Sequence, residues 1–221
     1  MITLFENYNQ MSEYVASIVA EEITNNPNLR LGLPTGSTPI GMYKNLIQFD
    51  LDWSNVKTYN LDEYEGIGEN HPQSYHTFMN KNLFLHVNLK KEFIHFPDKN
   101  LDTHLKQVGG LDLLILGIGH NGHIAFNEPG SSPTSATRRV KLTKETIIAN
   151  SRFFGSEDEV PKWAFTMGLK TIRESKRIIL IANGQDKWDI VNNCFNGDVT
   201  KDRPASVLQM HPNIEVFYAP Q

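Results

Sequence analysis

The sequence contains almost no cysteine: Cys194 is the only one among 221 residues. A single thiol excludes a disulfide within the chain and every metal site that needs several thiolates, and it is typical of a reducing compartment. The chain also lacks a long apolar run. Its start, MITLFENYNQ, has neither the basic residues nor the apolar stretch of a signal peptide, and no segment is long enough to span a bilayer. We therefore expect a cytoplasmic protein that has no membrane partner.

An excess of basic charge is missing as well. The 21 Lys and Arg residues are outnumbered by 25 Asp and Glu residues, which gives a formal net charge of -4. No extended positive surface is therefore expected for a nucleic acid or an anionic membrane, and an anionic ligand must be held locally. The sequence also has no linker, charge block or internal repeat. With 39% hydrophobic residues it predicts a single domain over residues 1–221.

Short apolar or β-branched runs alternate with segments of helical spacing. This alternation predicts an α/β fold, in which a mainly parallel sheet has helices on both faces in an α/β/α arrangement. The expected strands are residues 2–5, 31–33, 56–61, 111–116, 177–182 and 215–218. Helices are expected at residues 11–23, 39–49, 72–85 and 161–172, the last three beginning with proline, which is favourable at the first helical position.

Ligands of such sheets bind where strands end, and the first strand-end loop carries small hydroxyl residues. The segment LGLPTGSTP places Thr35, Gly36, Ser37 and Thr38 between a strand and a helix. Glycine allows close approach of the backbone, and hydroxyls and free amides suit a phosphate. The lysine of a Walker motif is missing, so a nucleoside triphosphate is disfavoured. A loop that only caps the helix remains an alternative.

In the second loop a carboxylate follows a strand directly. In the segment NLDEYEGI, Asp62 and Glu63 directly follow Leu61, the apolar end of the strand expected at residues 56–61. A partly desolvated carboxylate in this position can act as a general base for a proton next to a carbonyl. The alternative is a carboxylate that caps a helix or lies in water. His71 and His76, slightly further along, are expected to serve the surface or helix packing.

The third loop, LGIGHNGHIAFNEPG (residues 116–130), contains two histidines and an acid among glycines. His120, His123 and Glu128 could supply ligands for zinc, but their spacing crosses glycines instead of following a helix. Acid–base catalysis is the better interpretation, because a neutral histidine near its usual pKa gives and takes protons and a carboxylate can orient it. We expect His123 and Glu128 to be functional and His120 to be structural.

Basic residues follow the third loop and one later strand end. Arg138, Arg139, Lys141 and Arg152 form a positive segment, and Lys187 follows the strand in IANGQDKWDI. Arginine can bind a phosphate with two hydrogen bonds and lysine can bind it as a point charge. Each of these side chains could instead be simply solvated.

Several of these segments together resemble the glucosamine-6-phosphate deaminase family. They occur in the family's order and extend from residue 31 to residue 212, so their joint signal is specific although each motif alone is modest. The resemblance implies a Rossmann-like, doubly wound sheet, a fold shared with 6-phosphogluconolactonases. It rests on the segments LGLPTGSTP, NLDEYEGI, HPQSYHTFM, GIGHNGHIAFNEPGSS, NSRFF and LQMHP.

The resemblance also implies a reaction, the conversion of glucosamine 6-phosphate and water to fructose 6-phosphate and ammonia, with no cofactor and no metal. By carry-over, Asp62 moves a proton between C2 and C1, His123 assists ring opening, and Glu128 supports His123. Arg152, Lys187 and the turn from Thr35 to Thr38 would hold the phosphate. Residues 142–160 would form a lid over the sugar.

Two features depart from the family pattern. Asn121 stands where many members have an aspartate, and the resemblance implies that this position belongs to the catalytic set. An asparagine can hydrogen-bond His123 but cannot stabilise its positive form as a charge would, so we expect His123 to be less basic here. The chain also ends with EVFYAPQ, whereas larger members continue and form regulated hexamers, and Val140 replaces a lysine of their regulatory pocket. A monomer or small homo-oligomer is expected.

Two other functions compete with this interpretation. A 6-phosphogluconolactonase would share the fold, but lactonases resemble GDER in place of NLDEY and PDGHTAS in place of NGHIAFNE. A non-catalytic sugar-phosphate sensor would have lost its base and gained a DNA-binding module. Asp62, His123 and Glu128 are all present and the chain shows no helix-turn-helix segment, so the sequence favours an enzyme that acts on a small sugar phosphate.

Overall fold

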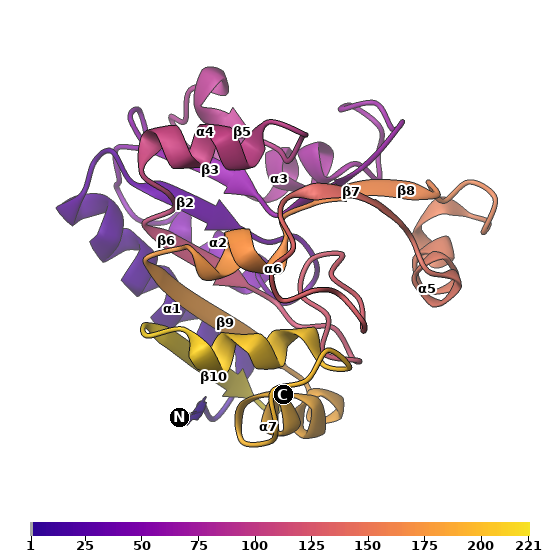
Figure 1. Ribbon diagram of the computed structural model, residues 1–221. Coiled ribbons are helices and arrows are strands. Elements are labelled where there is room, and N and C mark those ends of the chain that lie inside the picture. The colour runs from indigo at the N-terminus through magenta and orange to yellow at the C-terminus, as the bar shows by residue number, and fades with distance from the viewer. Residues whose placement is uncertain (1) are drawn as a thin grey trace.

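A computed structural model describes residues 2–221. Its centre is a seven-stranded sheet in which every pair of neighbouring strands is parallel (Figure 1). The predicted class, a doubly wound and mainly parallel α/β sheet, is confirmed. In spatial order the strands are β1 (Ile2–Leu4), β10 (Ile214–Ala219), β9 (Arg177–Asn183), β6 (Leu113–Leu116), β2 (Arg30–Leu33), β3 (Lys57–Asn60) and β5 (Ile94–His95).

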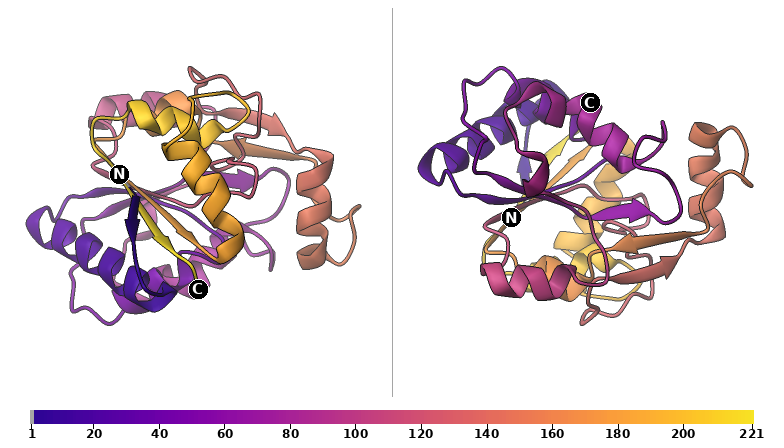
Figure 2. Two further views of the ribbon diagram at one scale, coloured as in Figure 1. Left: turned by 90° about the horizontal axis from the view of Figure 1, so that it is seen from below. Right: turned by 90° about the horizontal axis from the view of Figure 1, so that it is seen from above.

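The central strands are apolar on both faces, because helices cover both. Along β6, Leu113 and Ile115 belong to one buried cluster, and Leu114 and Leu116 belong to the other. This is the two-residue alternation that a strand imposes on its side chains. Figure 2 shows the two helical layers. One layer contains α1 (Tyr8–Asn25), α2 (Ile40–Leu46) and α3 (Tyr75–Asn82), and the other contains α4 (Leu101–Val108), α6 (Leu169–Arg173) and α7 (Trp188–Phe195).

A second, smaller sheet is antiparallel and was not predicted. It has the order β4 (Asp62–Tyr64), β8 (Trp163–Thr166) and β7 (Arg138–Lys141), and α5 (Lys144–Phe154) connects β7 to β8. Figure 1 shows the β7–β8 ribbon extending from the main body with α5 at its far end. Its buried cluster consists of Tyr64, Phe126, Leu142, Phe154, Val160 and Ala164.

The helix predicted at residues 161–172 is wrong for its first half. Residues Trp163–Thr166 form strand β8, and only Leu169–Arg173 are helical. Ala164 and Thr166 are buried while the alternate residues are half-buried, which is a strand period that the prediction overlooked. The two other helices that were predicted to begin with a proline are present, but each begins after it. Helix α2 begins at the residue after Pro39, and α3 begins three residues after Pro72, where Ser74 caps it.

The order of the strands determines where a ligand can bind. From β2 the chain proceeds through β3 and β5 to one edge, whereas β6, on the other side of β2, leads through β9 to β10. The boundary between β2 and β6 is therefore the topological switch point, and the loops at the carboxyl ends of these strands diverge there. Within residues 2–221, none of the helices combines the length and apolarity that crossing a bilayer requires.

Candidate active site

Most of the predicted site residues gather in one pocket of about 300 Å³ at the switch point. Its walls come from the loops that follow β2, β3, β6 and β9, together with one face of α5. The three strand-end loops that the sequence singled out therefore line a single pocket. Of the predicted residues, the pocket wall includes Thr35, Gly36, Ser37, Thr38, Asp62, His123, Glu128 and Lys187.

The loop after β2 is held from behind by a tyrosine. The Tyr8 hydroxyl of α1 donates to the carbonyl of Thr38 (2.9 Å) and accepts the amide of Gly41 (2.7 Å). The Thr38 hydroxyl donates to Asn183 Oδ1 (2.7 Å) at the end of β9, so two strand ends are tied together. Gly36 has a φ of +99°, which disfavours a side chain. The loop thus presents a fixed, largely exposed backbone to the pocket.

Asp62 is the first residue of β4 and only 8% of it is exposed. Burial, with a smaller contribution from the charge of Glu63, raises the pKa of Asp62 to about 8. Glu63 itself is not a second acid in the pocket. Its carboxylate accepts the amides of Tyr75 (3.1 Å) and His76 (3.0 Å), the first two residues of α3, and it contacts the His76 ring (2.8 Å). The capping alternative therefore holds for Glu63, while Asp62 faces the pocket.

The glycines of the third loop make room for His123. A side chain on Gly119 would meet the His123 ring at about 2 Å, so only glycine allows the ring to lie against this turn. The turn is closed by the Gly119 amide, which donates to the His123 carbonyl (2.9 Å). Ala125, two residues later, has a φ of +51°, which is unusual for a residue other than glycine. Such a strained backbone is found where a site is held in one geometry.

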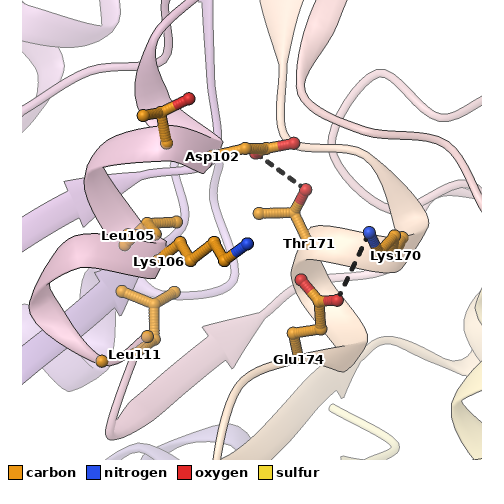
Figure 3. A pocket seen from close by; sticks show the side chains of 10 residues that line it. Asp102, Leu105, Lys106, Leu111, Lys170, Thr171 and Glu174 are labelled. Atoms are coloured by element: carbon orange, nitrogen blue, oxygen red, sulfur yellow. Dashed lines mark hydrogen bonds and ion pairs between the residues drawn. The ribbon is translucent and has the colours of Figure 1, made fainter.

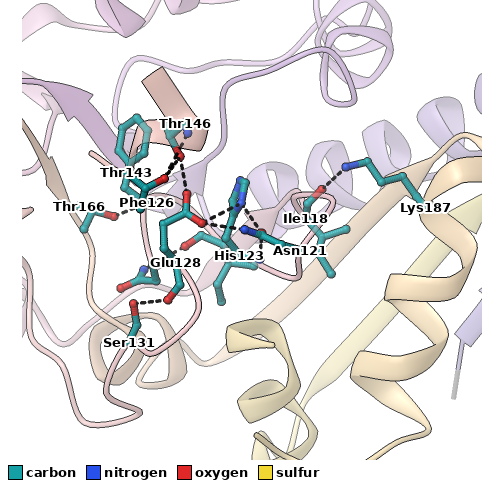
Figure 4. Close-up of polar contacts among 12 residues, drawn as sticks. Ile118, Asn121, His123, Phe126, Glu128, Ser131, Thr143, Thr146, Thr166 and Lys187 are labelled. Atoms are coloured by element: carbon teal, nitrogen blue, oxygen red, sulfur yellow. Dashed lines mark hydrogen bonds and ion pairs between the residues drawn. The ribbon is translucent and has the colours of Figure 1, made fainter. Parts of the chain in front are cut away.

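Asn121 lies between His123 and Glu128 (Figure 4). Asn121 Oδ1 is 2.7 Å from His123 Nδ1 and also accepts the backbone amide of His123 (3.1 Å). The backbone amide can only donate, so it fixes this atom of Asn121 as the oxygen. Asn121 Nδ2 then donates to Glu128 Oε2 (2.9 Å), which is 3.6 Å from His123 Nδ1. The carboxylate predicted to orient the histidine is therefore linked to it by hydrogen bonds through the asparagine.

This arrangement sets the tautomer of a neutral His123. Because Asn121 Oδ1 accepts at Nδ1, that nitrogen carries the proton and Nε2 keeps its lone pair. Burial lowers the pKa of His123, the charge of Glu128 opposes this, and His120 and Lys187 lower it further. At neutral pH the site thus holds a neutral imidazole that can accept a proton.

The two cations that were predicted to bind phosphate lie in different places. Lys187 lines the pocket and its Nζ donates to the carbonyl of Ile118 (3.3 Å); burial lowers its pKa. Arg152 lies on α5, is exposed, and stacks on the Phe153 ring at 4.6 Å, outside the pocket wall. His120 was expected to be structural, but it is exposed and lines the pocket. The structure does not place it in a core.

The pocket wall includes three polar residues that the sequence analysis did not single out, Tyr75, Thr146 and Asn150. Tyr75 is the first residue of α3, and burial raises its pKa well above the usual value. Thr146 and Asn150 come from α5, and each donates one side-chain hydrogen bond: Thr146 Oγ1 donates to Glu128 Oε1 (2.7 Å) and Asn150 Nδ2 donates to the Tyr64 hydroxyl (2.9 Å). Nothing in the local sequence distinguishes these side chains from those of an ordinary surface helix.

Comparison with known proteins places the chain in a family. A profile described as glucosamine-6-phosphate isomerases/6-phosphogluconolactonase matches residues 5–217. The chain belongs to this family. A glucosamine-6-phosphate deaminase of Thermoanaerobacter pseudethanolicus is 47% identical over 225 residues, which cover 96% of this chain and 89% of the relative. Glucosamine-6-phosphate deaminase 2 of Bacillus subtilis is 46% identical, with 98% and 93% covered.

Solved structures separate the two branches of this family. The structure matches a monomeric glucosamine-6-phosphate deaminase with a TM-score of 0.93 and 39% identity, over 99% of this chain and 96% of that one. A 6-phosphogluconolactonase of Thermotoga maritima has a TM-score of 0.77 at 17% identity, over 100% and 99% of the two chains. The lactonase shares the fold, whereas the sequence is much nearer to the deaminases.

A larger pocket of about 480 Å³ lies between α4 and α6 (Figure 3). Three of its four charged side chains have polar partners: Asp102 accepts the Thr171 hydroxyl (2.9 Å) and the Thr137 amide (2.9 Å), and Lys170 pairs with Glu174 (3.6 Å). It contains none of the predicted site residues. The smaller pocket is therefore the candidate active site, because it contains an acid and a histidine whose pKa values are shifted, Asp62 and His123.

Proposed function

We propose that the chain is a glucosamine-6-phosphate deaminase, which converts glucosamine 6-phosphate and water to fructose 6-phosphate and ammonia. One observation carries the proposal: a buried carboxylate, Asp62, and a histidine with a fixed tautomer, His123, face the same pocket at the strand ends. An aldose-to-ketose isomerisation needs a base beside two adjacent carbons and an acid–base group at the ring oxygen. Relatives at 46–47% identity with this name support it.

The phosphate is proposed to bind at the turn from Thr35 to Thr38, with Lys187 as its counter-charge. The turn presents amides and hydroxyls, and Lys187 lines the same pocket. A bound phosphate would stabilise the charged form of Lys187 and so offset the burial that lowers the pKa of this side chain. With the phosphate held at this end, the sugar ring extends toward Asp62 and His123.

Ring opening is assigned to His123. Its Nε2 lone pair accepts the proton of the C1 hydroxyl, and the resulting imidazolium returns a proton to the ring oxygen as the C1–O bond to the ring breaks. Asn121 Oδ1 holds the Nδ1 proton throughout, and Glu128, at 3.6 Å from Nδ1, stabilises the transient positive charge. Asn121 and Glu128 thus belong to the catalytic set with His123.

Isomerisation is assigned to Asp62. Its carboxylate removes the C2 proton while a proton of the neighbouring substrate ammonium passes to O1, which gives an enol; Asp62 then delivers its proton to C1, which leaves a protonated imine at C2. Water adds to this carbon, and ammonia departs. In the free site the raised pKa of Asp62, about 8, keeps much of it protonated at neutral pH. A bound substrate in its ammonium form would lower that pKa and ionise the base when it is needed.

We infer further that residues 142–160 act as a lid within the single domain. They include α5, which supplies Thr146 and Asn150 to the pocket while Arg152 stays outside it. A movement of the β7–β8 ribbon toward the pocket would carry Arg152 to the phosphate and shield the enol from water. The monomeric state named for the solved deaminase supports a monomer or small oligomer here.

The experiment that tests the function compares two substrates. The purified chain is incubated with glucosamine 6-phosphate, with and without a chelator, and ammonia and fructose 6-phosphate are measured separately. We expect equal amounts of both, unaffected by the chelator because no step above uses a metal. Hydrolysis of 6-phosphogluconolactone without release of ammonia from the amino sugar would instead make the chain a lactonase. Binding of the amino sugar phosphate without turnover would make it a sensor.

A further inference from the structure

We propose that Thr146 of α5 is a positioning residue, through which the lid helix holds Glu128 in the orientation that ring opening by His123 requires. The proposal rests on the function given above and extends it to a residue outside the strand-end loops. It joins two parts of the molecule that the catalytic steps treat separately, the lid and the histidine.

The contact begins at the first turn of α5. Thr143 caps this helix: its Oγ1 accepts the backbone amide of Thr146 (3.2 Å). Its hydroxyl proton is donated to Thr146 Oγ1 (3.1 Å). The Thr146 hydroxyl therefore has its own proton free to donate, and Glu128 Oε1 accepts it at 2.7 Å. A carboxylate cannot donate, so the direction of this hydrogen bond is fixed.

The same carboxylate continues the path to the histidine. Glu128 Oε2 accepts Asn121 Nδ2 (2.9 Å), and Asn121 Oδ1 is 2.7 Å from His123 Nδ1. Four hydrogen bonds thus run in series from the cap of α5 to the imidazole, as Figure 4 shows. Thr146 fixes one oxygen of Glu128 and Asn121 fixes the other. Without Thr146, the carboxylate can rotate about its last bond and lose its alignment with Asn121.

A second contact shows that this face of α5 lies against the body of the protein. Asn150, one helical turn after Thr146, donates to the Tyr64 hydroxyl (2.9 Å). Tyr64 packs against Phe126, which lies two residues before Glu128. Both α5 residues line the pocket, but only Thr146 contacts the Glu128 carboxylate. Ser151, whose hydroxyl donates to the Ile148 carbonyl within α5, lies outside the pocket wall and provides a control.

The test compares Thr146→Val, which keeps the shape and removes the hydroxyl, with Thr146→Ser, which keeps the hydroxyl. We expect Thr146→Val to lower kcat about tenfold, equivalent to ~1.4 kcal/mol, with KM changed less than about twofold. Thr146→Ser should restore most of kcat, and Ser151→Ala should match the wild type. Thr146→Ala, checked by circular dichroism and thermal melting, repeats the test should the valine variant fold poorly.

An acyclic inhibitor separates ring opening from binding. 2-Amino-2-deoxyglucitol 6-phosphate has no ring to open, so it should bind Thr146→Val as tightly as the wild type. The proposal would be overturned if Thr146→Val weakened the binding of this compound as much as it lowers kcat. It would also be overturned if the serine and valine variants lost kcat equally, or if kcat were unchanged in the valine and alanine variants. If the wild type releases no ammonia from glucosamine 6-phosphate, the proposed function itself has failed; if it does and the variants are unaffected, only the role of Thr146 has failed.

Discussion

The parallel sheet and the β7–β8 ribbon differ in how firmly they are held. Strands β6 and β9 are buried on both faces by two large side-chain clusters, whereas the ribbon and α5 share one small cluster. On α5, Ile148 and Phe153 remain 48% and 52% exposed. Local opening costs little free energy where few apolar contacts are lost. In the proposed mechanism Asp62 and His123 therefore stay at the ends of the firmly held strands, and the proposed movement is assigned to the ribbon.

Asp62 lies where these two regions join. It follows β3 of the parallel sheet by two residues, and as the first residue of β4 it pairs with Thr166 of β8. The proposed base is therefore anchored to the sheet yet adjacent to the strand that leads into the lid segment. A closing ribbon could exclude water from Asp62 without displacing it.

The largest effect is expected from a change at Asp62, where the parallel sheet and the ribbon join. Asp62→Asn removes the proposed base and keeps the side-chain size, so kcat should fall by about a thousandfold. Ammonia release by the folded variant would be measured, with Glu63→Gln as the neighbouring carboxylate control. If Asp62→Asn retains most of its activity, the proton transfer has been assigned to the wrong side chain.

The next prediction compares one cation from each region. Lys187→Met removes a charge that already lines the pocket and should raise KM about a hundredfold, the value of a strong charged hydrogen bond to phosphate. Arg152→Met should raise KM by about tenfold, because Arg152 reaches the phosphate only when the ribbon closes. Steady-state kinetics on both variants gives the comparison. An unchanged KM for Arg152→Met would show that the ribbon does not bring its cation to the substrate.

A smaller effect is expected within the rigid side of the site. Asn121→Asp places a negative charge beside His123 Nδ1 and should raise the pKa of His123 by about one unit. Less neutral imidazole then remains at low pH, so the base at Nε2 is lost earlier as the pH falls. The pKa is read from the His123 resonances by nuclear magnetic resonance, assigned with a His123→Gln variant. Identical titration of His123 in both proteins would show that Asn121 has no influence on its basicity.

The smallest expected effect is a change in the pH dependence of thermal stability, caused by the buried carboxyl group of Asp62. The pKa of Asp62 is about 8 in the folded protein, against an ordinary value of ~3.9 for an unfolded aspartate. Between these two values the folded protein binds the extra proton, so the wild type loses stability as the pH rises. Asp62→Asn escapes this loss. At pH 9 its Tm should exceed that of the wild type by about 2–4 °C, with less difference at pH 4, in thermal melts. A gain that does not grow with pH would contradict the burial of this charge.

Much of the parallel sheet could be predicted, because most of its strands lie in short apolar or β-branched runs; the two-residue strand β5 (Ile94–His95) does not, and it was missed. The site at the switch point follows from the same pattern: once the strands are parallel, the loops after them must meet. Asp62, His123 and Lys187 could therefore be placed together from the sequence alone. The resemblance to the deaminase family, now confirmed by the family match, added the reaction to this placement.

The ribbon could not be predicted in the same way. The strand Trp163–Thr166 is short and follows a proline, and a spacing of three and four residues can be fitted to the same letters as its alternation of two. The position of Asn121 between His123 and Glu128 depends on a glycine turn whose φ values the sequence does not reveal. Thr146 is an ordinary helix residue until the path of the chain brings it to Glu128.

The most direct test of the whole account is a crystal structure of the protein with 2-amino-2-deoxyglucitol 6-phosphate bound. The account predicts the phosphate on the turn from Thr35 to Thr38 and on Lys187, with C2 about 3–3.5 Å from the Asp62 carboxylate, as a reacting pair requires. It also predicts an unmoved parallel sheet and a ribbon shifted so that Arg152 reaches the phosphate. A phosphate bound elsewhere, or a closed site reached by movement of the strand ends instead of the ribbon, would contradict it.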